Sequence, residues 1–144
     1  MSKTTLQTID KKVTSILSRL PKAASAAKFS LPDLKKGEAY VGGTISADGT
    51  VTHTILLPGE KADVNWNDAM AWAKKAGGDL PNRIEQAMLY AHHADKFQKR
   101  YYWSNETHAD VSGYAWGQGF NYGGQSTWHK GNKYMARAVR RATI

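Results

Sequence analysis

Apolar side chains recur three or four positions apart within the first 21 residues. The series is Leu6, Ile9, Val13, Ile16 and Leu20. This alternation of three and four is the heptad seam of an amphipathic helix, and Pro21 is expected to end it. Two heptads are too short to hold an isolated coiled coil, so the seam docks on the chain's own domain or packs against copies of itself. In the second case residues 1–21 form an oligomerisation arm and residues 22–37 a linker.

Two β-rich runs come next, at residues 38–46 and 51–57. They flank Ala47-Asp48-Gly49-Thr50, and Asp-Gly between two such runs is a strong hairpin signal. The Pro58-Gly59 pair then breaks the second run. The pattern predicts an antiparallel hairpin at the start of a domain that spans residues 38–144.

Helical spacing replaces the β pattern after the hairpin. Asn67 is predicted to cap a first helix that ends at Gly77-Gly78. Asn82 and Glu85 have capping-box spacing at the start of a second helix, which should fray near Asp95. The apolar positions of the first helix are Ala69, Trp72, Ala73 and Ala76. The predicted buried face of the second helix consists of Ile84, Ala87, Met88 and Ala91.

From residue 101 the chain is again rich in β-forming residues. Three strands are predicted, at residues 101–104, 114–120 and 134–141, joined by turns rich in Gly and Asn. Strands, then two helices, then strands indicate an α+β fold, with two helices packed on a twisted antiparallel sheet. The amphipathic segment at residues 1–21 adds an extra N-terminal helix to this plan.

Size and composition exclude several classes of protein. The 144 residues contain 41% apolar residues and no cysteine, so disulfides, thiol nucleophiles and thiolate metal sites are excluded. No apolar run approaches the roughly 18 residues of a membrane span. Residues 1–12 are polar and basic and lack the pattern of a secretory signal. These features predict a protein without membrane contact.

Several motifs of the domain resemble the DUF1566 family. They are the runs at residues 64–73 and 77–86, then Tyr102-Trp103-Ser104, and finally residues 136–141. Many relatives carry Trp-Arg where this chain has Gly78-Asp79. The resemblance implies a C-type-lectin-like fold in a phage- or prophage-encoded protein without a known reaction. Within these motifs we expect structural roles, with buried or paired side chains, for Trp66, Trp72, Arg83, Glu85 and Trp103.

The sequence contains no recognisable catalytic or metal-binding set. The adjacent His92 and His93 point about 100° apart on a helix and cannot share one ion, and no zinc motif exists. Trp66-Asn67-Asp68 matches a tripeptide of calcium-dependent lectins but starts a helix here, without the partner motif. Nucleophile and phosphate-loop motifs are also missing. We therefore predict no enzyme activity, no cofactor and no metal; a turnover dependent on His108 or His129 would contradict this.

A stretch of 27 residues near the C-terminus combines aromatic residues with Gly, Ser, Asn and Thr. Interfaces favour this mixture, although aromatic packing within a glycine-loosened sheet also explains it. The candidate partner-binding residues are Asn105, Trp116, Tyr122, Gln125, Trp128 and His129. The leading hypothesis is a non-catalytic module that binds a host or phage protein. It would act as an inhibitor of host defence, such as an anti-CRISPR protein, in the bacterial cytoplasm, or as a virion accessory.

Nucleic-acid binding is the alternative, because both ends of the chain are basic. The net charge of +8 divides into +6 for residues 1–37, −3 for residues 38–129 and +5 for residues 130–144. Such ends could track phosphates, although solvated ends that aid solubility give the same pattern. The candidate cations are Lys11, Lys12, Arg19, Lys22, Lys28, Lys130, Lys133, Arg137, Arg140 and Arg141.

Overall fold

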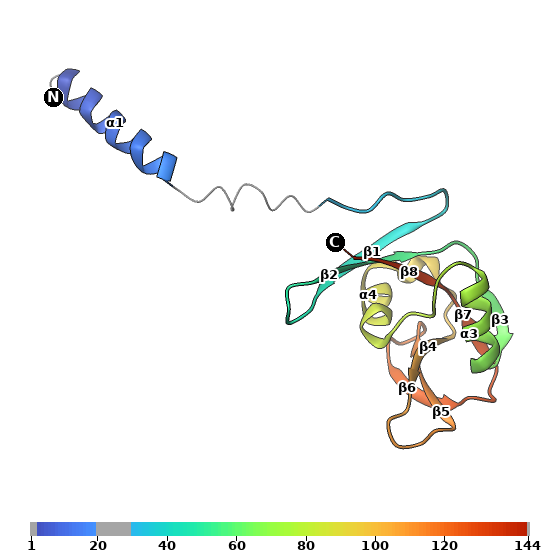
Figure 1. Cartoon of the computed structure of the whole chain (residues 1–144). Helices are drawn as coiled ribbons and strands as arrows, with labels where there is room; N and C mark the ends of the chain where they lie inside the picture. Colours follow the sequence, from blue (N-terminus) through green and yellow to red (C-terminus); the bar gives the residue numbers. More distant parts are fainter. Residues whose placement is uncertain (1–2, 20–29, 144) are drawn as a thin grey trace. The chain divides into compact units, whose positions relative to one another are not determined.

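The computed structural model describes residues 3–19 and 30–143, with side chains described for residues 8–16 and 30–143. The chain divides into two compact units, Met1–Leu31 and Pro32–Ile144. The first unit contains helix α1 (Lys3–Arg19), drawn in Figure 1. Three of its predicted seam residues are exposed, namely Ile9 (46%), Val13 (49%) and Ile16 (60%). Leu6 and Arg19 belong to α1 but their side chains lie outside the described part, as do Leu20, Lys22 and Lys28 altogether.

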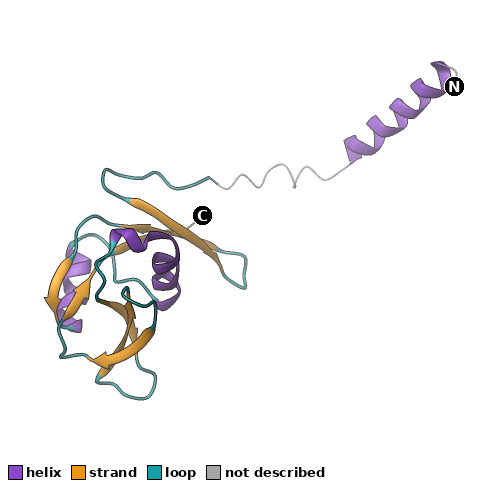
Figure 2. Cartoon of the chain, turned by 180° about the vertical axis from the view of Figure 1, so that it is seen from behind, coloured by secondary structure: helices purple, strands orange, loops and turns teal. Residues whose placement is uncertain are grey.

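The second unit is an α+β fold, which confirms the predicted class. It contains two helices, a 3₁₀ turn and eight strands. Figure 2 draws the helices in purple and the strands in orange. The elements are β1 (Ala39–Ile45), β2 (Val51–Leu56), β3 (Lys61–Val64), α3 (Trp66–Lys75), α4 (Arg83–His93), η1 (Ala94–Lys96), β4 (Tyr101–Thr107), β5 (Tyr114–Gly119), β6 (Gln125–His129), β7 (Tyr134–Ala136) and β8 (Val139–Thr143). They form two sheets, of order β1-β2-β8 and β3-β7-β4-β5-β6. The second sheet is mixed, because β4 pairs with β7 in parallel, so the prediction of one antiparallel sheet was too simple.

The hairpin is where the Asp-Gly signal predicted it. β1 and β2 pair antiparallel from Ala39–Leu56 to Ile45–Val51, with a register shift between Tyr40 and Gly42. At the turn, Thr50 N donates to Asp48 Oδ1 at 2.9 Å. Gly49 takes a φ of +85°, which residues with a Cβ rarely adopt.

Helix α3 begins two residues earlier than predicted. Its cap is Asn65, whose Oδ1 accepts a hydrogen bond from Asp68 N at 2.9 Å, so the prediction of Asn67 as the cap was wrong. Trp66, as the first helical residue, turns its indole inward, and Trp66 Nε1 donates to Ser104 O at 2.8 Å. The predicted C-terminus is correct, because Gly77 has a φ of +94° directly after the last turn.

Helix α4 starts with the predicted capping box but buries the opposite face. Asn82 and Glu85 satisfy each other's backbone N–H groups, both at 2.8 Å. The predicted buried face was wrong, because Ile84 is 63% exposed and Ala87 and Ala91 are also exposed, with Met88 half-buried. The buried side chains are Glu85, Gln86 and Leu89.

The two buried polar residues of α4 form hydrogen bonds to the sheets, although Gln86 Oε1 has no partner among the described residues. Both Glu85 oxygens accept from Arg141, at 2.7 and 2.8 Å, and Oε2 also accepts from Thr54 Oγ1 at 2.8 Å. Gln86 Nε2 donates to Tyr102 O at 3.0 Å. A buried polar group is tolerated when its hydrogen bonds are formed, and hydrophobic periodicity cannot reveal such a face.

The predicted strand at residues 134–141 is two strands in different sheets. β7 pairs with β3 and β4, and β8 pairs with β2, with Arg137 and Ala138 between them. Strands β3 and β6 were not predicted. Ala136, Ala138 and Val139 are buried on both sides of the break, and the single polar residue there, Arg137, also fits the alternation of one continuous strand.

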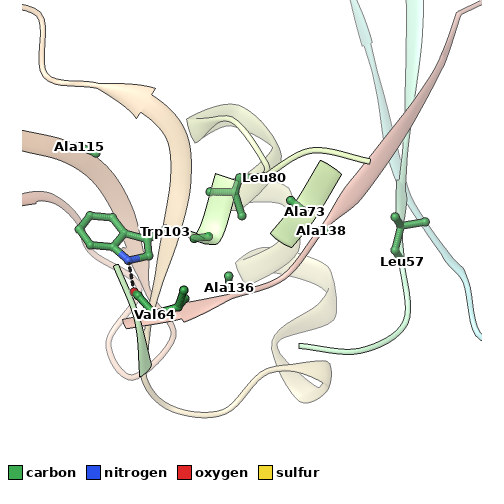
Figure 3. Close-up of a cluster of buried hydrophobic side chains, with 9 residues drawn as sticks. Leu57, Val64, Ala73, Leu80, Trp103, Ala115, Ala136 and Ala138 are labelled. Carbon is green, nitrogen blue, oxygen red and sulfur yellow. Dashed lines mark hydrogen bonds between the residues drawn. The ribbon is translucent and has the colours of Figure 1, made fainter. Parts of the chain in front are cut away.

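The core contains two clusters of apolar side chains. Figure 3 shows the first, in which Trp103 lies among small and aliphatic side chains such as Leu80 and Ala136. The Trp103 indole donates to Val64 O at 2.9 Å, which satisfies its polar atom inside the core. Trp72 is half-buried against this cluster. The second cluster joins α4 to both sheets through Leu56, Leu89 and Phe120.

Candidate functional site

The turn between β5 and β6 carries the most exposed large hydrophobic side chain among the described residues. Tyr122 is 92% exposed at its tip. Beneath it the backbone is tightly bonded, with Gly119 N donating to Gly124 O at 2.8 Å and Gly123 N to Gly119 O at 3.0 Å. The turn therefore presents an aromatic ring to solvent from an ordered base.

Helix α4 holds this turn from one side. Tyr90 packs directly on Gly123, where an added Cβ would lie 2.5 Å from the tyrosine ring. Gly123 also has a φ of +87°, so both space and backbone conformation require glycine there. The Tyr90 ring in turn meets Phe120 edge to face, with centroids 5.8 Å apart. Tyr90 therefore links the turn to the second core cluster, which contains Phe120.

Two hollows adjoin the turn and share Gln125. The larger, of about 630 Å³, lies between the start of α4 and the β5–β6 turn; its lining includes Arg83, Ile84, Tyr90, Glu106, Gln118 and Gln125. The smaller, of about 500 Å³, is lined by Tyr122, Trp128, Tyr101 and Tyr134 among others. We call Tyr122 and these two hollows the turn surface.

Two glutamines order the floor of the larger hollow. Gln125 Nε2 donates to Gln118 Oε1 at 3.1 Å and to Arg83 O at 2.7 Å. Buried Gln118 donates in turn to Gly119 O at 3.1 Å. Gln125 Oε1 accepts from Arg83 Nε at 3.0 Å. The network connects the first residue of α4 to the β5–β6 turn, and it fixes the orientation of both amides.

Arg83 lies over an aromatic ring at the edge of this hollow. Its guanidinium carbon is 3.5 Å from the centroid of Trp116, which is the geometry of a cation–π contact. The ring of His108 is parallel to Trp116 at 6.5 Å. Glu106 Oε2 accepts from the backbone N–H of Arg83 at 2.6 Å, and no ion pair joins the two side chains within the described residues.

The structure gathers some of the predicted partner-binding residues and separates others. Trp116, Tyr122 and Gln125 all belong to the turn surface or touch it. Trp128 lines the smaller hollow, yet its ring packs on Trp103 and Tyr134 at the core, with centroids 5.9 and 4.7 Å away.

Two predicted partner-binding residues make local contacts elsewhere. Asn105 donates to Asp79 Oδ2 at 2.8 Å. Asp79 and the buried Glu85 of α4 both bind Arg141. The ring of His129 meets Tyr114 edge to face, and its Nδ1 accepts from Gly131 N at 3.0 Å. Both side chains thus have partners within the fold.

Several residues of the larger hollow were not predicted as binding residues, and their signals differ. Ile84 was assigned to the buried face of α4, whereas it is exposed. The capping box fixes the start of α4. If Glu85 is assigned to the buried face of the helix, Ile84 falls on the exposed face. Arg83 was expected to tie the helix to the sheet, and it does bond to Gln125 of β6. Its contact with Trp116 joins positions far apart in sequence and leaves no local pattern.

The three C-terminal arginines are engaged within the fold. Arg140 binds Glu38 through two hydrogen bonds of 2.8 Å, and Arg141 binds Glu85 and Asp79. These carboxylates raise the pKa of both guanidinium groups, and Arg140 lowers the pKa of Glu38 to about 2. Arg137 donates to Leu57 O at 2.9 Å and Lys96 O at 2.7 Å, and burial lowers its pKa.

The described lysines of the alternative site form no ion pair within the described residues. Lys130 lies over Trp66, with Nζ 4.6 Å from the ring centroid. Lys133 is exposed after β6, and Lys11 and Lys12 are exposed on α1. The C-terminal arginines, by contrast, are paired with carboxylates or carbonyls of the fold.

Metal-ligating side chains do not gather in the described part of the chain. No group of three or more His, Asp or Glu residues that could hold an ion occurs there. His92 and His93 lie at the end of α4, where His92 is exposed and His93 half-buried. None of the described helices is long and apolar enough to cross a membrane.

No family model matches the chain, and no curated protein matches it at a significant level.

Proposed function

We propose that the chain is a non-catalytic protein-binding module that contacts its partner through the turn surface. The observation that carries this proposal is Tyr122, 92% exposed on a turn anchored by Tyr90 and hydrogen-bonded at its base. Aromatic side chains that are presented on a rigid base lose little conformational entropy on binding. A hollow on each side of such an anchor can receive side chains of a partner.

The nature of the partner follows from the family resemblance, which is part of the proposal. A DUF1566-like, C-type-lectin-like scaffold of phage or prophage origin would use an exposed loop surface to engage a host or phage protein. Inhibition of host defence in the bacterial cytoplasm and a role in the virion both fit such a surface. The α+β fold with two helices and two sheets supports this scaffold at the level of class.

Nucleic-acid binding has weaker support. Of the ten candidate cations, Arg137, Arg140 and Arg141 are held by carboxylates and carbonyls of the fold. Breaking such pairs to bind phosphate would leave Glu85 buried without its partner. If nucleic acid were the ligand, affinity would fall by roughly 0.7–0.9 log units per tenfold increase in salt for each phosphate neutralised. A flat salt dependence would exclude it.

The test compares capture of a partner by three forms of the tagged full-length chain, from nuclease-treated lysates of uninfected and phage-infected bacteria. The forms are the natural chain, Tyr122→Ala and Ile45→Ala. Ile45 is 67% exposed on the β1–β2 hairpin and serves as the matched control. We expect one stoichiometric protein that Tyr122→Ala loses by about tenfold or more and Ile45→Ala retains, in line with an aromatic anchor. Equal capture by all three forms would overturn the proposal.

A further inference from the structure

Arg83 differs from the other arginines whose side chains are described. Arg100, Arg137, Arg140 and Arg141 all direct at least one terminal nitrogen to an oxygen of the protein. Arg83 donates from Nε to Gln125, and its two terminal nitrogens have no partner among the described residues. The free end of a guanidinium is a fork of N–H donors that matches the two oxygens of a carboxylate.

The position of this fork is fixed before any ligand arrives. Trp116 supports the guanidinium at 3.5 Å, and Gln125 holds Nε at 3.0 Å. Gln125 is itself held by Gln118 and by Arg83 O. A preorganised donor loses less entropy on binding than a mobile one. Arg83 is half-buried and is one of the residues that line the larger hollow.

We propose that the larger hollow receives an aspartate or glutamate side chain of the partner protein, clamped by Arg83. This inference rests on the proposed function and names the chemistry that the turn surface recognises. The single guanidinium pairs with a single carboxylate, and the Glu106 carboxylate on the same lining repels a dianion such as phosphate more strongly than it repels a monoanion. Ile84, 63% exposed on the same lining, adds apolar area for a neighbouring aliphatic side chain of the partner.

The first experiment uses the full-length chain and two blocked tripeptides, acetyl-Leu-Glu-Leu-amide and acetyl-Leu-Gln-Leu-amide. The signals of the Arg83 Nε–H and Trp116 Nε1–H groups are followed by NMR during titration. We expect the Glu peptide to shift both signals and to bind about tenfold more tightly than the Gln peptide, as a charge-assisted pair requires. Equal affinities would overturn the carboxylate assignment. So would displacement of the Glu peptide by inorganic phosphate at equal or lower concentration.

Variants separate the clamp from general attraction to a basic protein. Arg83→Lys keeps the charge but removes the fork, and we expect it to weaken the Glu peptide about tenfold while leaving the Gln peptide unchanged. Lys133→Gln removes an exposed charge that does not line the hollow and should change neither affinity. A loss with Lys133→Gln equal to that with Arg83→Lys would show non-specific attraction and overturn the inference. Thermal unfolding of each variant checks that the fold is retained.

The two proposals fail separately. If Tyr122→Ala abolishes capture of the partner but the two peptides bind equally, the module stands and the carboxylate clamp is wrong. If the Glu peptide binds selectively but capture does not depend on Tyr122, the hollow binds carboxylates and the assignment of the turn surface as the partner interface is wrong.

Discussion

At the scale of single residues, Glu38 is a carboxyl group whose pKa the fold lowers. It precedes β1 and accepts two hydrogen bonds from Arg140 of β8 and one from Lys35 N. These donors favour the carboxylate and lower its pKa from 4.5 to about 2. The pair connects the entrance of the hairpin to the far strand of the three-stranded sheet.

This pKa shift predicts acid sensitivity. A carboxyl group whose pKa is lower in the folded state than in the unfolded state stabilises the fold above its unfolded pKa. The contribution is therefore complete above about pH 4.5 and is lost as the pH falls toward 2. We expect Glu38→Gln to lower the free energy of unfolding at pH 7 and to flatten its decline between pH 4.5 and 2, measured by urea unfolding at each pH. Asp110→Asn, at an exposed position, is the control; the same flattening in both variants would contradict the assignment to Glu38.

At the scale of the elements, the end of α3 and strand β8 approach each other closely. A Cβ added to Gly78 would lie 2.1 Å from Val139 O and 2.9 Å from Leu57 Cδ1. Val139 O cannot move away freely, because it accepts from Asp79 N at 2.8 Å while Val139 N donates to Asp79 O at the same distance. The helix end and the strand therefore approach at a distance that a side chain would prevent.

Substitution of this glycine tests that packing. Gly78→Ala should lower the free energy of unfolding by about 3 kcal/mol, because overpacking against backbone forces the strand to shift. Gly113→Ala places its Cβ in open space and should change stability by less than about 0.5 kcal/mol. Urea unfolding of both variants measures the difference. Similar values for the two would show that the α3–β8 junction adapts without cost.

The elements predictable from sequence are those specified by neighbouring residues. Asp48-Gly49 gave the hairpin, and Asn82 with Glu85 gave the start of α4, because turns and caps are local hydrogen-bond chemistry. The buried face of α4 was not predictable by hydropathy, since Glu85 is made compatible with burial by Arg141, 56 positions away. The division of residues 134–143 between two sheets is likewise set by distant strands.

The candidate site was predictable in part for the same reason. Tyr122 and Gln125 follow a Gly-rich turn, a local cue that indicated exposure. The larger hollow, however, requires α4 to be placed beside the β5–β6 turn, which depends on tertiary packing. The local sequence therefore identified Tyr122 as a binding residue. It did not identify Arg83 or the larger hollow as parts of the same surface.

At the scale of the whole molecule, the first unit carries an apolar seam that the second unit does not contain. Ile9, Val13 and Ile16 are exposed at spacings of four and three, which suits packing between copies of α1. Self-association would bring several turn surfaces together, and multivalent contact strengthens binding without new chemistry.

We predict that this seam holds copies of the chain together. Replacing Ile9, Val13 and Ile16 together by Ser, or deleting residues 1–21, should lower the mass measured by light scattering. Lys11→Ser with Lys12→Ser changes exposed residues of the same helix outside the apolar series and should leave the mass unchanged. A monomeric mass for the natural chain and all variants would exclude association through α1.

The division of residues 134–143 between the sheets also has a consequence for biosynthesis. β3 pairs with β7, and β2 pairs with β8 on one side. Neither pairing can form until residues at least 70 positions further along the chain have been synthesised. While the ribosome is still adding these residues, unpaired strand edges of the nascent chain are open to contact with other chains. We therefore expect residues 32–143 to acquire their fold together after Thr143 emerges from the ribosome, rather than strand by strand during translation.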